Sequence, residues 1–99
     1  MLASNITSQI TSIAARFPDI EKVLLFGSRA HGDHSPRSDI DLAIIAPDMT
    51  SRDWLTFTDT LEEELETLLK IDVINLSTAS KKLVDEVDQC KVVLYQRGI

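Results

Sequence analysis

The stretch Phe26-Gly27-Ser28-Arg29-Ala30-His31-Gly32 and the later segment Asp39-Ile40-Asp41 decide the fold of this chain. A run of apolar residues, 23–26, ends at Gly27, and a second apolar run, 42–46, begins directly after Asp41. Short apolar runs bounded by glycine and polar residues are typical of buried strands. Because alternate residues of a strand point to the same side, we expect Asp39 and Asp41 to present two carboxylates on one face of a sheet.

These two aspartates form a candidate metal site. Like charges held this close raise each other's pKa unless a cation lies between them. Mg²⁺ prefers hard oxygen ligands and usually takes one or two protein carboxylates, with water and substrate phosphate completing its shell. The alternative interpretation is a pair of strand-end aspartates that cap a turn.

Gly27 and Ser28 form a candidate phosphate site beside this pair. A glycine after a strand allows the backbone to approach a phosphate closely, and Ser28 stands where a short helix is expected to begin, which favours negative charge. By itself, Gly27 would be interpreted as a turn glycine. Arg29 is either a third phosphate ligand or a surface side chain on the first turn of that helix.

Asp72 is an unexpected residue in a third predicted strand, Ile71–Leu76, which is otherwise largely apolar. An ionised carboxylate in such a strand is costly unless it is paired or bound to a metal. If this strand lies beside the second one, Asp72 can join Asp39 and Asp41. The alternative is a structural salt bridge with a lysine such as Lys70 or Lys22.

The combined pattern, Gly27-Ser28, ten residues, then Asp39-x-Asp41, resembles the signature of the polymerase-beta-type nucleotidyltransferase superfamily. More narrowly, it resembles the minimal nucleotidyltransferase (MNT) proteins, the small partners of HEPN-domain proteins. The resemblance covers nearly the whole chain and so implies one nucleotidyltransferase domain over residues 1–99. His31 departs from the family, which more often has Arg or Lys there, and this departure concerns contact with the nucleotide rather than the metal site.

The resemblance implies an α/β fold with a small mixed sheet of three or four strands and helices packed mainly on one face. It also implies transfer of AMP from ATP to a hydroxyl group, with two Mg²⁺ ions held by Asp39 and Asp41. Asp72 would complete the acidic set and draw the proton from the attacking hydroxyl. The acceptor implied is a tyrosine of a cognate HEPN ribonuclease toxin, so that the chain would act as an antitoxin.

The rest of the chain alternates between helical and strand patterns, which supports an α/β architecture. Apolar residues recur at helical spacing from Ile6 to Phe17, and again after a capping box at Thr50-Ser51-Arg52-Asp53. A last helix is predicted over 78–90, followed by a short strand over 92–95. Residues 33–37 are predicted to be a loop. The helix predicted after Thr50 has an apolar stripe made of Trp54, Phe57, Leu61, Leu65 and Leu68. Its acidic residues are predicted to form a solvated face; they are Asp59, Glu62, Glu63, Glu64 and Glu66.

Composition narrows the class of protein further. The 99 residues suit one domain, and a chain this small is marginal in stability, which makes a partner subunit plausible as a homo- or hetero-oligomer. The net charge of −6 argues against nucleic acid as a bulk partner, and a nucleotide triphosphate would need a cation to bind. The single cysteine, Cys90, excludes an internal disulfide and a cysteine-based zinc site. We find no membrane span or signal peptide and expect a cytoplasmic protein.

Two alternative functions remain open at this point. One is a binding-only antitoxin that occludes its partner while the site is vestigial, although the presence of all three acidic residues favours catalysis. The other is the catalytic half of a split small-molecule nucleotidyltransferase of the aminoglycoside-modifying type, whose partner brings the acceptor pocket.

Overall fold

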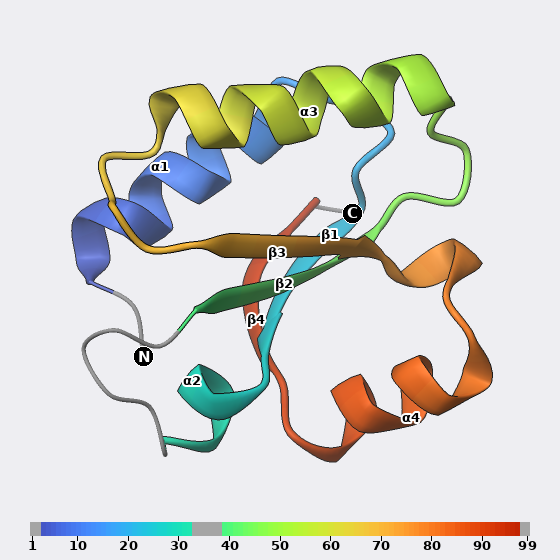
Figure 1. The fold of residues 1–99 in the computed structure, drawn as a ribbon. Coiled ribbons are helices and arrows are strands. Elements are labelled where there is room, and N and C mark those ends of the chain that lie inside the picture. Colours follow the sequence, from blue (N-terminus) through green and yellow to red (C-terminus); the bar gives the residue numbers. More distant parts are fainter. Residues whose placement is uncertain (1–2, 33–38, 98–99) are drawn as a thin grey trace.

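A four-stranded mixed sheet forms the centre of the structure, a computed structural model that describes residues 3–32 and 39–97 (Figure 1). The strand order is β3-β2-β1-β4. β1 runs antiparallel to both β2 and β4, whereas β2 runs parallel to β3. The strands are β1 (Lys22–Phe26), β2 (Ile40–Ile45), β3 (Ile71–Asn75) and β4 (Val92–Gln96). The expected mixed sheet is therefore confirmed, with four strands.

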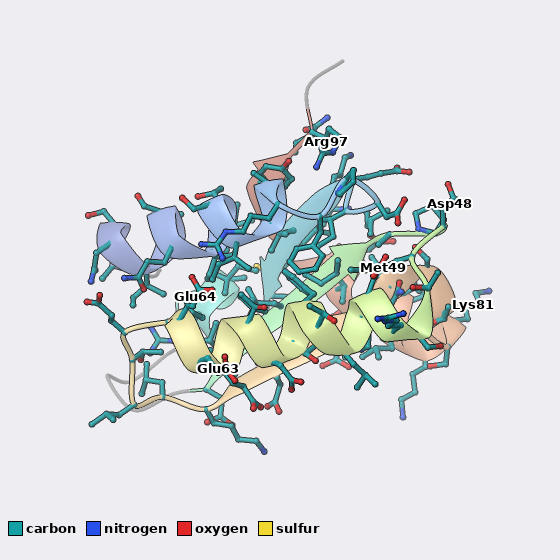
Figure 2. The ribbon with its side chains drawn as sticks, turned by 90° about the horizontal axis from the view of Figure 1, so that it is seen from above. Asp48, Met49, Glu63, Glu64, Lys81 and Arg97 are labelled. Atoms are coloured by element: carbon teal, nitrogen blue, oxygen red, sulfur yellow. The ribbon has the colours of Figure 1, made fainter. Side chains whose placement is uncertain are left out.

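Helices lie on both sides of this sheet, with the two longer ones on one face (Figure 1). That face is covered by α1 (Ser4–Ala15) and α3 (Ser51–Glu64), which are seen from above in Figure 2. The short α2 (Ser28–His31) and α4 (Lys81–Gln89) lie on the opposite side. The last predicted helix begins later than expected, because residues Leu76–Thr78 form a separate 3-10 turn, η1, and Ser80 caps α4.

The main core lies between the sheet and the pair of long helices. Its fully buried side chains include Ile10 and Ile13 of α1, Phe57 and Leu61 of α3, and Leu42 of β2. A smaller apolar cluster lies on the other face, where Leu24, Phe26 and Ala43 pack against Val87 of α4. Alternation along β2 therefore directs Leu42 to the main core and Ala43, with Asp41, to the α4 face.

The ends of α3 follow from local chemistry. The Thr50 hydroxyl oxygen accepts a hydrogen bond from the Asp53 backbone N–H at 3.1 Å, which confirms the predicted N-terminal cap. At the other end, the Arg16 guanidinium donates two hydrogen bonds to the Glu64 carboxylate, at 2.8 and 2.9 Å, and links α1 to α3. The acidic side chains predicted to form a solvated face are all exposed, and Glu63 and Glu64 are labelled in Figure 2; the set is Asp59, Glu62, Glu63, Glu64 and Glu66.

The prediction that Leu68 continues the apolar stripe of α3 is wrong. The helix ends at Glu64 because Leu65 has an extended backbone, with φ −69° and ψ 126°, and the helical period stops there. Leu65 still reaches the core, but Leu68 is fully exposed. The predicted loop at 33–37 lies outside the described residues. Within the described ranges, no helix is both long and apolar enough to cross a membrane.

Two identical substitutions test this arrangement of α3. Leu61→Ala should lower the free energy of unfolding by about 2–5 kcal/mol, because Leu61 is completely buried in the main core. Leu68→Ala should change it by less than about 0.5 kcal/mol, because Leu68 contributes no buried surface. Urea unfolding followed by circular dichroism measures both values. A comparable loss in the two variants would contradict the end of the helix described above.

Candidate active site

The register of the sheet brings the predicted site residues together at one end of β2. Asp41 is paired with Phe26 of β1 on one side and with Asp72 of β3 on the other. Residues paired across neighbouring strands project to the same face, so the Asp41 and Asp72 side chains both lie on the α4 side. Asp39, two residues before Asp41, precedes β2 at the same end and is exposed.

Gly27 lies directly against the Asp41 carboxylate. It has a positive φ of +74°, which side chains other than glycine rarely adopt. A Cβ atom placed on Gly27 would collide with Oδ2 of Asp41 and would lie 3.3 Å from its Cγ. Glycine is therefore required here for the turn after β1 and for the position of Asp41, and α2 begins at the next residue, Ser28.

Asp41 is in an environment that disfavours its charge. Its pKa is raised above the ordinary value of 3.8, first by burial and then by the negative charges of Asp72, Asp39 and Glu86, while Lys70 opposes the rise. Within the described part of the chain, no group donates a hydrogen bond to the Asp41 carboxylate, so the turn-capping interpretation has no support for this residue. A half-buried carboxylate among other carboxylates matches the hard oxygen ligands that Mg²⁺ prefers.

The three aspartates do not form a closed metal cage. Among residues 3–32 and 39–97, no group of three or more histidine, cysteine or acidic side chains is close enough to hold a metal ion. A magnesium ion bound by one or two carboxylates, water and substrate phosphate does not need such a cage. The assignment of Asp39, Asp41 and Asp72 as metal ligands stays a prediction.

Asp72 has the lysine partner that the structural interpretation requires. The Lys70 ammonium lies 3.6 Å from Oδ1 of Asp72, and the two side chains are 71% and 45% exposed. Exposed ion pairs of this kind contribute only about 0–1 kcal/mol to stability. The structural interpretation therefore has its lysine partner but gains little stability from it, and the catalytic role of Asp72 stays a prediction.

Arg29 lies in an unexpected environment. Its side chain is only 6% exposed, so the interpretation as a surface arginine is wrong. It is the one buried polar or charged residue in the part of the chain that the structure describes. The assignments of Gly27, Ser28 and Arg29 to phosphate binding stay predictions.

The sequence does not predict that Glu86 lies near the candidate site. It is an exposed residue of α4, and its charge acts on Asp41 from the helix that packs over this face. Nothing in the sequence distinguishes it from the other acidic residues of that helix, because only the packing of Val87 against the sheet places Glu86 near Asp41.

Comparisons with known proteins identify a family and a shared fold. The family described as polymerase beta, nucleotidyltransferase matches residues 8–98. No curated protein sequence matches the chain. Among solved structures, a toxin–antitoxin with AMP-PNP is 25% identical with a TM-score of 0.75, over 92% of this chain and 73% of that chain.

Two further structures share the fold at 22% identity. One is the toxin–antitoxin MntA-HepT, with a TM-score of 0.72 over 96% of this chain and 74% of that one. The other is a tri-AMPylated Shewanella oneidensis HEPN toxin in complex with an MNT antitoxin, with a TM-score of 0.70 over 94% of this chain and 71% of that one.

Alanine substitution of Gly27 and Gly32, the two glycines with positive φ, distinguishes the cost of backbone strain from a loss of ATP binding. Gly27→Ala and Gly32→Ala should each lower the free energy of unfolding by about 1–2 kcal/mol, because both require a left-handed backbone. Only Gly27→Ala should also weaken the binding of ATP with Mg²⁺ in calorimetry, because a Cβ at position 32 meets no atom within 4 Å. Equal ATP affinities in the two variants would show that the nucleotide binds elsewhere.

Asp41→Asn should raise the melting temperature of the metal-free protein at neutral pH. A raised pKa means that the folded protein holds the Asp41 proton more tightly than the unfolded chain does, so stability falls as the pH rises from the ordinary value of 3.8 through the raised pKa. Asparagine has nearly the same size as aspartate but no charge, so the substitution should remove this pH-dependent loss of stability. Thermal unfolding in EDTA between acid and neutral pH measures the effect.

The gain from Asp41→Asn should shrink as the solution is acidified, because Asp41 itself becomes neutral. Asp59→Asn, at an exposed position of α3, is the control and should show no such gain. Identical melting temperatures for Asp41→Asn and the native protein at neutral pH would contradict the described environment.

Proposed function

Because the chain belongs to the polymerase beta nucleotidyltransferase family, we propose that it transfers AMP from ATP to a tyrosine hydroxyl of a HEPN-domain toxin and thereby silences it. The observation that carries this proposal is the strand register that sets Asp41 between Gly27 and Asp72. The similar toxin–antitoxin with AMP-PNP supports ATP as donor. The similar fold of the MNT antitoxin that accompanies a tri-AMPylated HEPN toxin supports the class of acceptor.

The donor would be bound at the junction of β1 and β2. Asp39 and Asp41 would hold Mg²⁺, two ions in all, and the backbone of Gly27 with Ser28 and Arg29 would contact the phosphates. The bound ions would neutralise the charge that develops on the triphosphate during transfer. This cation requirement also accounts for how a chain with a net charge of −6 holds an anionic substrate.

Asp72 would take the proton from the attacking hydroxyl. The hydroxyl oxygen forms a bond to the α-phosphorus of ATP, the bond from that phosphorus to the pyrophosphate oxygen breaks, and the proton passes to the Asp72 carboxylate. Asp72 suits this role because it is paired with Asp41 across the two strands yet remains accessible from solvent. We place the reaction in the cytoplasm, in a complex with the toxin.

Intact-mass measurement of a co-purified HEPN-domain protein tests the proposal. With ATP and Mg²⁺, the native chain should increase the mass of the partner in steps of one AMP, and EDTA should stop the increase. Asp72→Asn should slow single-turnover transfer by about 10²–10⁴-fold while leaving ATP affinity nearly unchanged, because it removes the base while the metals and the triphosphate would be held mainly by Asp39, Asp41 and Ser28.

Asp59→Asn, on the solvated face of α3, is the matched control and should transfer AMP at the native rate. A near-native rate in Asp72→Asn would return Asp72 to the structural role of an ion-pair partner for Lys70. If the native chain neutralised the toxin with no mass gain, the occlusion hypothesis would replace enzymatic transfer.

A further inference from the structure

β3 leaves one side of its backbone without a strand partner. It is the last strand in the sheet order, and only β2 pairs with it (Figure 1). The Ile40 N–H donates to the Lys70 carbonyl oxygen at 2.9 Å, which fixes the pattern of this parallel pair. Residues 72 and 74 then direct their backbone groups to β2, whereas Ile71 and Val73 direct theirs outward. No described residue forms a hydrogen bond with the N–H or C=O of Ile71 or Val73.

A groove runs beside this edge, between β3 and α3. One hollow, of about 190 Å³, is lined by apolar side chains, Leu61, Ile71 and Val73, and by polar ones, Thr58, Glu62 and Asp72. A second, of about 240 Å³, is lined by Leu65 and other residues of the loop before β3. The two hollows share Glu62 and Ile71 and are therefore neighbours. The groove therefore has a mixed lining, in which apolar side chains alternate with threonines and with the charged groups of Glu62, Asp72 and Lys70.

We propose that an extended segment of the partner protein pairs with the outward edge of β3 and carries the acceptor hydroxyl opposite Asp72. This inference rests on the proposed function and specifies where its acceptor binds. Edge strands commonly recognise partners in this way, because backbone hydrogen bonds supply affinity and alternate side chains supply specificity.

The register of such a segment follows from the geometry of β3. A residue directly opposite Asp72 projects to the α4 face, with Cβ atoms about 4.5–5.5 Å apart, so a long side chain such as tyrosine can reach Asp72 and Asp41. The residues before and after it project to the α3 face and enter the groove. A shift of one residue would place the hydroxyl on the wrong face, so we expect the acceptor residue to lie directly opposite Asp72 and its two neighbours to contact the mixed lining of the groove.

The acceptor chemistry favours a partner protein over a second copy of this chain. A second copy paired through its own β3 would bring no hydroxyl opposite Asp72, because Ile71–Asn75 contains no serine, threonine or tyrosine. Lys70 of the groove is already paired with Asp72, so a partner segment with a cationic side chain at the rim would complement Glu62. The other edge of the sheet, β4, exposes Val93 but lies two strands away from β2, so a segment paired there could not reach Asp72.

Amide hydrogen exchange of the isotope-labelled chain, free and with the unlabelled HEPN-domain protein, tests this edge. The amides of Ile71 and Val73 should exchange at least about tenfold more slowly in the complex, whereas those of Asp72 and Ile74 should be protected in both states. AMP transfer to the same partner is measured separately by intact mass.

The outcomes distinguish the two proposals. Protection of Ile71 and Val73 without AMP transfer would support the edge and contradict the proposed function. AMP transfer without protection would overturn the edge and leave the proposed function standing, and absence of both complex and transfer would contradict both proposals. Protection that appears in the free chain as its concentration rises would identify a second copy as the occupant and overturn the partner assignment.

Reversing the charge of Glu62, at the rim of the groove, is a second test of the docking site, and this exposed position should tolerate the change without loss of folding. Glu62→Lys should raise the KM for the partner by at least about threefold and weaken its salt dependence, because the complementary charge is lost. Glu63→Lys, at the neighbouring exposed position of α3 (Figure 2), makes the same change in net charge outside the groove and should leave the KM unchanged. Equal effects in the two variants would overturn the role of the rim.

Discussion

The close approach of the Asp41 carboxylate to the backbone of Gly27 constrains the whole site. It requires a residue with no Cβ and a positive φ directly after β1, so the chain can turn into α2 only at this point. It also requires β2 to lie beside β1 with Asp41 opposite Phe26. The parallel addition of β3 to the other side of β2 then brings Asp72 to the same place.

This arrangement separates the two faces of the sheet by role. The face under α1 and α3 buries the larger apolar cluster and holds most of the stabilising contacts. The α4 face has a smaller cluster and carries the aspartates at one end. The apolar core on the first face can compensate for the cost of a partly desolvated carboxylate on the second, which is a common compromise at functional sites.

The edge of the sheet is as important as its face. Asp72 belongs to an outer strand, so the proposed acceptor would approach it from the side that carries no further strand, whereas Asp41 belongs to the inner strand β2 and Gly27 directly follows the inner strand β1. A donor held between β1 and β2 and an acceptor arriving along β3 would meet over the same pair of carboxylates. The proposed base and the proposed metal ligands thus come from different strands, which allows one substrate to bind without blocking the other.

The local amino-acid sequence determined most of the helices and strands, because hydrophobic periodicity and capping residues act over a few positions. It also indicated the candidate donor residues, since Gly27-Ser28 and the Asp39/Asp41 pair are each recognisable from neighbours in sequence, but the contact of Gly27 with Asp41 depends on the pairing of β1 with β2. The spacing of apolar residues predicts that α3 continues to Leu68, but spacing alone does not show that Leu65 leaves the helical backbone.

Only the tertiary structure decided what depends on contacts between distant residues. The pairing of β3 with β2 places Asp72 beside Asp41, the packing of α4 brings Glu86 near them, and the folded chain buries Arg29. Strand order, register and burial arise from the burial of apolar surface by the whole chain, and this cannot be read from the spacing of residues within any one segment.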